Sequence, residues 1–215
     1  MSGPILVINP NSNLEVTAGL EEAVAPFRLG GGPEIECHTL AEGPFGIESQ
    51  AHSDLVVAPL VQWAEGRPDA GAIVIACYSD PGLETLREKL ACPVFGMQES
   101  GVLAALGRGD LVGVIAAATP SIRRHRRYLR RMGALDRLAG EAPLELTVAE
   151  TGGEGAGPKL LAAGEALKAE GAEALVLGCA GMARHRGRLE EALGTPVIEP
   201  VQAAVAAALG ALLPR

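Results

Sequence analysis

Two apolar runs that each end in a cysteine decide the fold: Ala-Ile-Val-Ile-Ala-Cys at residues 72–77 and Ala-Leu-Val-Leu-Gly-Cys at residues 174–179. Continuous apolar runs of this length are typical of strands that are buried on both faces of a parallel sheet. Similar runs, bounded by Gly, Pro and Asn, recur along the chain. They predict eight strands, at 5–8, 35–39, 72–76, 93–95, 111–117, 144–149, 174–177 and 196–198.

Longer stretches with helical periodicity fill the gaps between these runs. They predict helices at 14–25, 53–64, 83–90, 121–131, 159–169 and 182–193, followed by a C-terminal helix within 200–215. Strands that alternate with helices indicate an α/β fold with mostly parallel sheets.

The second half of the chain repeats the first. Cys77 and Cys179 lie 102 residues apart, and Cys92-Pro-Val-Phe matches Thr195-Pro-Val-Ile at an offset of 103. A repeat of this size predicts two pseudosymmetric lobes, each with a mostly parallel four-stranded sheet flanked by helices. We place the first lobe at residues 1–97 and the second at 98–199, with the active site in the cleft between them.

Composition narrows the class of partner. The 215 residues are 48% hydrophobic and 20% charged, which is typical of a folded chain. A net charge of −8 and only 3% aromatic residues argue against a nucleic-acid partner. We find no apolar run of the roughly 20 residues that a membrane span needs and no secretory signal. We therefore expect a cytoplasmic protein with reduced cysteines, no membrane partner and a small-molecule substrate.

The two matched cysteines carry the candidate chemistry. Ligands of parallel sheets bind beyond the carboxyl ends of the strands, where Cys77 and Cys179 both lie. A single free thiol is more often a packing residue, but two in matched positions suit the inversion of a carbon acid. One thiolate removes a proton from one face, and the opposite thiol returns a proton to the other. Such a reaction needs no metal or redox cofactor, and the four histidines show no metal-ligand spacing.

Five segments, spread over almost the whole chain, resemble the hydantoin and allantoin racemase branch of the aspartate/glutamate racemase superfamily. They are ILVINPNSN at 5–13, FGIES at 45–49, ACYSDPGL at 76–83, LVLGCAGM at 175–182 and PVIEPVQAAV at 196–205. The resemblance implies a cofactor-independent racemase with Cys77 and Cys179 as its two acid/base residues. It also implies a C-terminal helix, 200–215, that crosses back to the first lobe, and a homo-oligomer.

The same resemblance implies a set of substrate-binding residues. They are Asn11, Ser79, Asp80, Thr119, Ala180 and Gly181. Their polar members are also candidates for helix caps. The sequence departs from the branch at Tyr78-Ser79, where hydantoin racemases often have Phe-Asp, and at Glu199-Pro200, where they have Asp-Gly. These departures lie beside the inferred pocket and leave the substrate open.

The sequence is compatible with several functions. The first is racemisation of 5-substituted hydantoins or allantoin; the alternatives are an aspartate/glutamate-type amino-acid racemase and a maleate isomerase-like enzyme. A non-enzymatic alternative is a small-molecule binding module whose lobes close on a ligand. The basic run Arg123–Arg131 is predicted to be a solvated helix face that pairs with acidic groups or with a partner subunit. The Gly-rich segment 151–159 is predicted to be a flexible loop.

Overall fold

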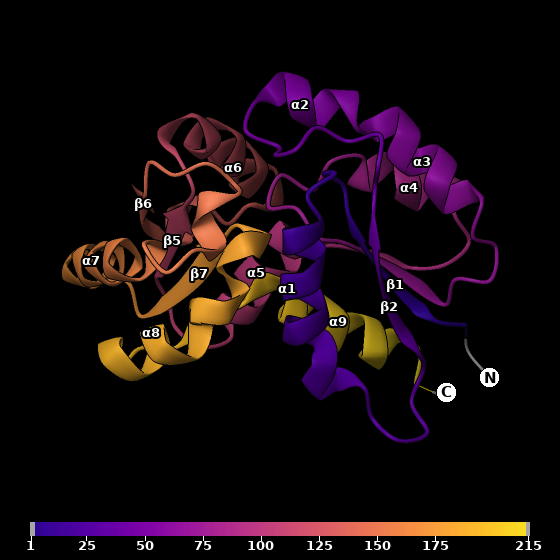
Figure 1. Cartoon of the computed structure of the whole chain (residues 1–215). Coiled ribbons are helices and arrows are strands. Elements are labelled where there is room, and N and C mark those ends of the chain that lie inside the picture. The colour runs from indigo at the N-terminus through magenta and orange to yellow at the C-terminus, as the bar shows by residue number, and fades with distance from the viewer. Residues whose placement is uncertain (1–2, 214–215) are drawn as a thin grey trace.

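Two parallel sheets form the framework of the molecule (Figure 1). The computed structural model describes residues 3–213. The strand order is β2-β1-β3-β4 in the first sheet and β6-β5-β7-β8 in the second. Their bounds are β1 Ile5–Asn9, β2 Ile35–Thr39, β3 Ala72–Ile75, β4 Val94–Gly96, β5 Val112–Ala116, β6 Leu138–Pro143, β7 Ala174–Gly178 and β8 Val197–Ile198. The second order is the first with each number raised by four, which confirms the predicted α/β fold of two similar lobes.

Helices flank both sheets. They are α1 Leu14–Val24, α2 Gln50–Leu55, α3 Val57–Glu65, α4 Leu83–Lys89, α5 Met97–Leu106, α6 Thr119–Met132, α7 Ala156–Ala169, α8 Arg186–Leu193 and α9 Pro200–Ala211. Short 3-10 turns lie at η1 Ala25–Phe27, η2 Leu135–Arg137, η3 Glu150–Gly152 and η4 Ala180–His185. Every residue of β1, β3 and β7 is buried, as expected of strands covered on both faces. Between residues 3 and 213, no helix is long and apolar enough to span a membrane.

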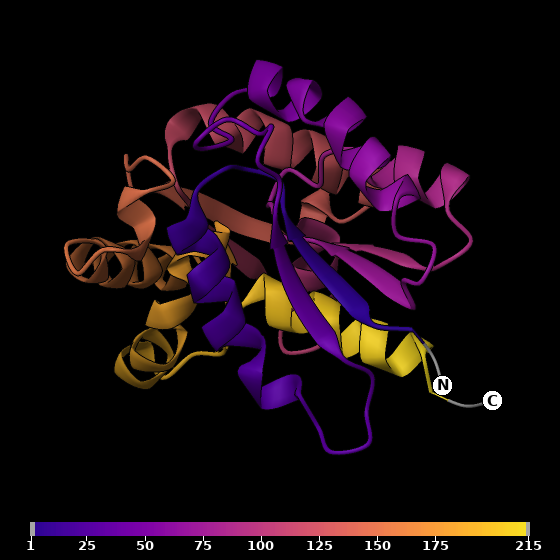
Figure 2. The same ribbon diagram turned by 45° about the vertical axis from the view of Figure 1, so that its right-hand side comes forward.

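The last helix of each lobe packs against the other lobe. Helix α5 follows the first sheet and contacts β7 of the second. Helix α9 follows the second sheet and contacts β1, β3 and β4 of the first, and Figure 2 shows this yellow helix running beneath the indigo strands. The two helices also contact each other, and a Cβ atom on Gly101 would stand 2.6 Å from Pro200 Cβ. Gln202 Nε2 on α9 donates to Ala23 O on α1 at 2.9 Å. The exchange of helices fixes how the two sheets face each other; the division of the chain at residue 97 stays a prediction.

The strand predicted at 144–149 is wrong. The strand β6 occupies 138–143 instead, and residues 144–149 form the loop that follows it. Because β6 is an edge strand that pairs only with β5 and is mostly half-buried, its sequence Leu-Ala-Gly-Glu-Ala-Pro is less apolar than a central strand. Leu144 and Val148 are buried by packing on the rest of the molecule outside any sheet. The apolar pattern at residues 144–149 therefore indicates that the segment is buried, but it does not indicate a strand.

Candidate active site

The two predicted thiols line the same cavity, and both lobes build it. Cys77 lies just beyond β3 and Cys179 just beyond β7. The cavity holds only about 40 Å³, whereas pockets for small ligands commonly measure about 300 Å³ or more. Its lining is Asn11, Val16, Ile47, Ala76, Cys77, Tyr78, Ser79, Ala117, Ser121, Arg124, His125, Val148, Gly178, Cys179 and Ala180. A ligand of that size therefore fits beside the two thiols only if the lining moves apart.

Each cysteine opens an equivalent turn. The N–H of Asp80 donates to Cys77 O at 2.9 Å, and the N–H of Met182 donates to Cys179 O at 3.1 Å. Within each turn the backbone N–H two residues after the cysteine lowers the pKa of the thiol, from Ser79 at Cys77 and from Gly181 at Cys179. A donor at a sulfur favours the thiolate over the thiol. The internal repeat therefore places the same thiolate-stabilising group at both sites.

Burial shifts the pKa of both thiols in the opposite direction to the backbone N–H groups. It raises the pKa of Cys77 to about 12, and the negative charges of Asp80 and Cys179 push in the same direction. Burial is also the main cause that raises the pKa of Cys179. A buried thiol loses the hydration that a thiolate needs, so the neutral form is favoured in both places. The hydrogen-bond donors and charges around each sulfur decide how readily a thiolate forms there.

Cys179 has a side-chain partner that the sequence did not point to. Thr151 is fully buried in η3, and its Oγ1 lies 3.5 Å from Cys179 Sγ. The contact lowers the pKa of Cys179 against the effect of burial. A Cβ atom on Gly181 would stand 2.3 Å from Thr151 Oγ1, so only glycine fits there without displacing the hydroxyl. The segment 151–159, which was predicted to be a flexible loop, thus begins with a residue that contacts the Cys179 thiol. Its second half is helical, because α7 starts at Ala156.

Three of the predicted binding residues, Asn11, Ser79 and Ala180, line the cavity with the thiols. Asn11 Oδ1 accepts the N–H of Asn13 at 2.9 Å and an Nδ2 hydrogen of Asn9 at 3.0 Å. The backbone N–H of Asn11 donates to Asn9 Oδ1 at 3.2 Å, whereas its side-chain nitrogen Nδ2 makes no hydrogen bond within residues 3–213. It is therefore available as a donor to a carbonyl group in the cavity.

Asp80 lies outside this cavity and has a structural task. Its two carboxyl oxygens accept the N–H groups of Gln98 and Glu99, each at 3.0 Å, and so cap α5. Burial raises its pKa to about 7. Gly96 makes room for this cap, because a Cβ atom there would stand 2.3 Å from the carboxyl group. Asp80 therefore acts as a helix cap, but the helix that it caps is α5 and not α4, which begins at Leu83.

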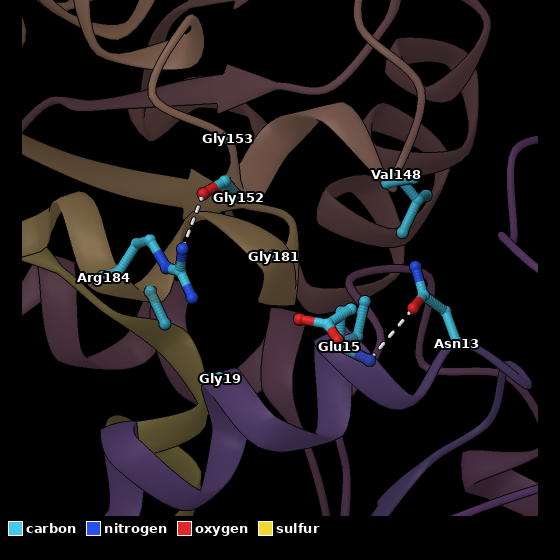
Figure 3. Close-up of a pocket in the computed structure, with 11 residues that line it drawn as sticks. Asn13, Glu15, Gly19, Val148, Gly152, Gly153, Gly181 and Arg184 are labelled. Atoms are coloured by element: carbon cyan, nitrogen blue, oxygen red, sulfur yellow. Dashed lines mark hydrogen bonds between the residues drawn. The ribbon is translucent and has the colours of Figure 1, made fainter.

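Thr119 and Gly181 line other cavities. Thr119 is exposed at the start of α6, where its hydroxyl donates to Glu145. Gly181 lines a cavity of about 210 Å³ between α1 and η4. Figure 3 shows that cavity, with Glu15 on one side and Gly181 and Arg184 on the other. The thiol cavity and this one share Val16 and Val148 in their linings.

Arg124, on the basic helix α6, is a member of the site that sequence reasoning missed. Two arginines of α6 pair with acidic groups, as predicted for the run Arg123–Arg131: Arg126 with Glu141 at 3.0 Å and Arg131 with Glu84 at 2.7 Å. Arg124 instead lines the thiol cavity, and its Nε donates to Ser79 Oγ at 3.3 Å. Its positive charge lowers the pKa of Cys77. A run of arginines in the sequence does not show which of them faces the cavity.

Known proteins share both this sequence and this fold. A family model described as Asp/Glu/Hydantoin racemase matches residues 5–208. A hydantoin racemase from Paenarthrobacter aurescens is 38% identical over 93% of this chain and 87% of its own. The solved allantoin racemase from Klebsiella pneumoniae has a TM-score of 0.88 and 28% identity, over 97% of this chain and 87% of its own.

A second solved allantoin racemase, from Pseudomonas fluorescens, has a TM-score of 0.88 and 25% identity over 96% of this chain and 89% of its own. The resemblance stated from the sequence motifs is thereby confirmed. The chain belongs to the Asp/Glu/Hydantoin racemase family, in its hydantoin and allantoin racemase branch, and is an isomerase that acts as a racemase.

Proposed function

We propose that the protein racemises 5-substituted hydantoins, allantoin included, by proton transfer between Cys77 and Cys179. The observation that carries this proposal is the pair of thiols in equivalent turns, one from each lobe, that line a single cavity. The substrate class is supported by relatives that are a hydantoin racemase and allantoin racemases. In both kinds of substrate the stereocentre carries a hydrogen next to a ring carbonyl, which makes it a carbon acid.

In the proposed reaction one sulfur enters as a thiolate and the other as a thiol. The thiolate takes the proton from C5, and the electron pair of the C–H bond moves into the ring to form an enolate. The thiol on the opposite face then gives its proton to C5, and the electron pair returns to form the new C–H bond. The product has inverted configuration, and the two sulfurs have exchanged protonation states. A second turnover from the other enantiomer restores them.

The surrounding residues have defined tasks in this scheme. The N–H groups of Ser79 and Gly181 stabilise whichever sulfur is the thiolate. The free amide hydrogens of Asn11 are placed to donate to the carbonyl oxygen on which enolate charge develops. Ala180 supplies a small surface against which the flat ring packs.

The test uses single enantiomers of 5-benzylhydantoin, 5-(carboxymethyl)hydantoin and allantoin in deuterated buffer without added metal or cofactor. Enzyme-dependent loss of optical rotation, with deuterium entering at C5 in the proton NMR spectrum, is the expected result. An enzyme-free blank corrects for spontaneous racemisation. Aspartate, glutamate and maleate serve as comparison substrates, and turnover of one of these without any hydantoin turnover contradicts the proposal. Assembly as a homo-oligomer and a cytoplasmic location stay predictions.

A further inference from the structure

Helix α6 lines a second, wider cavity next to the thiol cavity. This outer cavity holds about 450 Å³ and lies between the start of α6 and the start of α2, which run close together at the top of Figure 1. Three arginines line it: Arg123, Arg124 and Arg127. Arg124 also lines the thiol cavity, so its side chain stands where the two spaces meet.

The positive charges of Arg123, Arg124 and Arg127 are not paired with a carboxylate among residues 3–213. Within residues 3–213 none of them forms an ion pair, although the chain has 26 acidic residues and other arginines of α6 are paired. Burial lowers the pKa of Arg124, and the charge of Arg127 lowers it further. Arg123 and Arg127 are exposed, so only the charge of Arg124 is partly desolvated. An anion beside Arg124 would offset that cost.

Arg124 also has unused hydrogen-bond donors. Its Nε donates to Ser79 Oγ and its Nη1 to Pro120 O, each at 3.3 Å. Both distances are long, and Nη2 has no partner within the part of the chain that the structure describes. A guanidinium group offers five N–H donors in a planar fork that matches a carboxylate. The group is therefore placed to bind an anion that reaches out of the thiol cavity.

We infer that Arg124 selects hydantoins whose 5-substituent ends in a carboxylate, such as the carboxymethyl and carboxyethyl compounds, while Arg123 and Arg127 attract them into the outer cavity. This inference rests on the proposed function, which puts the ring between the thiols. In that pose, a 5-substituent that points toward Ser79 reaches the guanidinium group, because Arg124 Nε donates to Ser79 Oγ. The positive outer cavity compensates for the net charge of −8, which otherwise repels an anionic substrate.

The test compares two substrates that differ only in charge: 5-(carboxymethyl)hydantoin and its amide, 5-(carbamoylmethyl)hydantoin. The wild-type protein is expected to prefer the carboxylate in kcat/KM by about 10-fold or more, the value of a charged hydrogen bond. Arg124→Met is expected to bring the ratio close to 1, mainly through KM, and Arg124→Lys to keep part of the preference. Rates come from deuterium entry at C5. The preference shrinks as salt concentration rises.

Arg130→Met is the matched control. Arg130 is an exposed residue of the same helix that lines neither cavity, so its loss removes one positive charge without touching the site. Its substrate ratio is expected to equal that of the wild type. Thermal melts of both variants report whether each is folded, and the wild-type ratio itself tests the inference even if Arg124→Met does not fold.

The outcomes separate this inference from the proposed function. A wild-type ratio at or below 1 overturns the role of Arg124 but leaves hydantoin racemisation standing, provided that uncharged hydantoins are turned over. A preference that survives in Arg124→Met overturns it equally. If no hydantoin of either kind gains deuterium, the proposed function falls and the inference falls with it.

Discussion

Thr151 Oγ1 lies 3.5 Å from Cys179 Sγ and donates its own hydrogen to the carbonyl oxygen of Val148 at 2.7 Å. In the thiol state Cys179 can therefore donate to the threonine oxygen, and in the thiolate state the hydroxyl can turn to donate to the sulfur. Cys77 is supported differently, by the charge of Arg124. The repeat gives the two thiols equivalent turns, and their other neighbours tune each thiol separately.

Thr151→Val is expected to raise the pKa of Cys179, because the hydroxyl that favours the thiolate is lost. Racemisation at pH 7 should fall about 10-fold, the scale of one hydrogen bond to a charged group, and its rise with pH should shift upward. Since two enantiomers have equal free energies, kcat/KM must fall equally in both directions. The measurement is the pH profile of racemisation, with Thr151→Ser as the variant that keeps the hydroxyl. An unchanged profile in Thr151→Val would show that the contact has no part in catalysis.

Gly181→Ala tests the same contact from the other side. The added methyl group would stand 2.3 Å from Thr151 Oγ1 and must displace it from Cys179. We expect a loss of kcat of about 10-fold or more, with the fold retained. Gly187→Ala is the control, because that exposed position on α8 has open space around it. Equal activity of the two alanine variants would contradict the expectation.

The cap formed by Asp80 predicts a pH dependence of stability. Its pKa is raised from 3.8 to about 7, mainly by burial, so the folded protein holds this proton more tightly than the unfolded chain does. Its contribution to the free energy of unfolding is therefore fully present below about pH 4 and is lost as the pH rises through about 7. Asp80→Asn removes the titration and suits the local backbone, because φ is 41° and asparagine tolerates the left-handed region.

The difference in unfolding free energy, wild type minus Asp80→Asn, should be largest below about pH 4 and shrink as the pH rises through about 7. Urea denaturation at several pH values measures it. Asp136→Asn, at an exposed position, controls for the loss of one negative charge. A difference that grows with pH would mean that the folded protein favours the carboxylate at Asp80.

Tyr78 has a buried hydroxyl with no hydrogen-bond partner among residues 3–213. Its ring packs edge-on against His125 with 4.8 Å between ring centroids. Tyr78→Phe keeps the ring and removes the unsatisfied oxygen, so the free energy of unfolding should stay equal or rise by about 1 kcal/mol. Thermal and urea denaturation measure the change. A loss of stability greater than about 1 kcal/mol would reveal a partner for the hydroxyl.

Much of the fold could be predicted from the sequence because buried parallel strands are continuous apolar runs. The same property caused the error at residues 144–149, where Leu144 and Val148 are apolar because they are buried in a loop. The edge strand β6 escaped notice because it contains Gly140 and Pro143 and is mostly half-buried. Strand signals therefore report how deeply a segment is buried more reliably than how it is hydrogen-bonded.

Some residues of the candidate site could be predicted from the sequence and others could not. Cys77 and Cys179 could be found because each follows the carboxyl end of a strand, where ligands of parallel sheets bind, and because the two positions match in the internal repeat. Thr151 and Arg124 could not be found, since their places depend on the course of a loop and on the rotation of a helix. The resemblance implies that Asp80 binds substrate, but its carboxyl group lies outside the thiol cavity and caps α5, a long-range contact that the sequence does not show.

The exchange of the C5 proton in single-cysteine variants tests the central claim most directly. Cys77→Ala and Cys179→Ala are each incubated with each enantiomer of the best hydantoin substrate in deuterated buffer, with Cys92→Ala, a substitution outside the cavity, as the control. Each site variant is expected to lose racemisation in both directions by about 100-fold or more. Each should still exchange deuterium into one enantiomer without inverting it, and the two variants should act on opposite enantiomers. Wild-type racemisation by either variant, or exchange of the same enantiomer by both, would contradict the two-thiol mechanism.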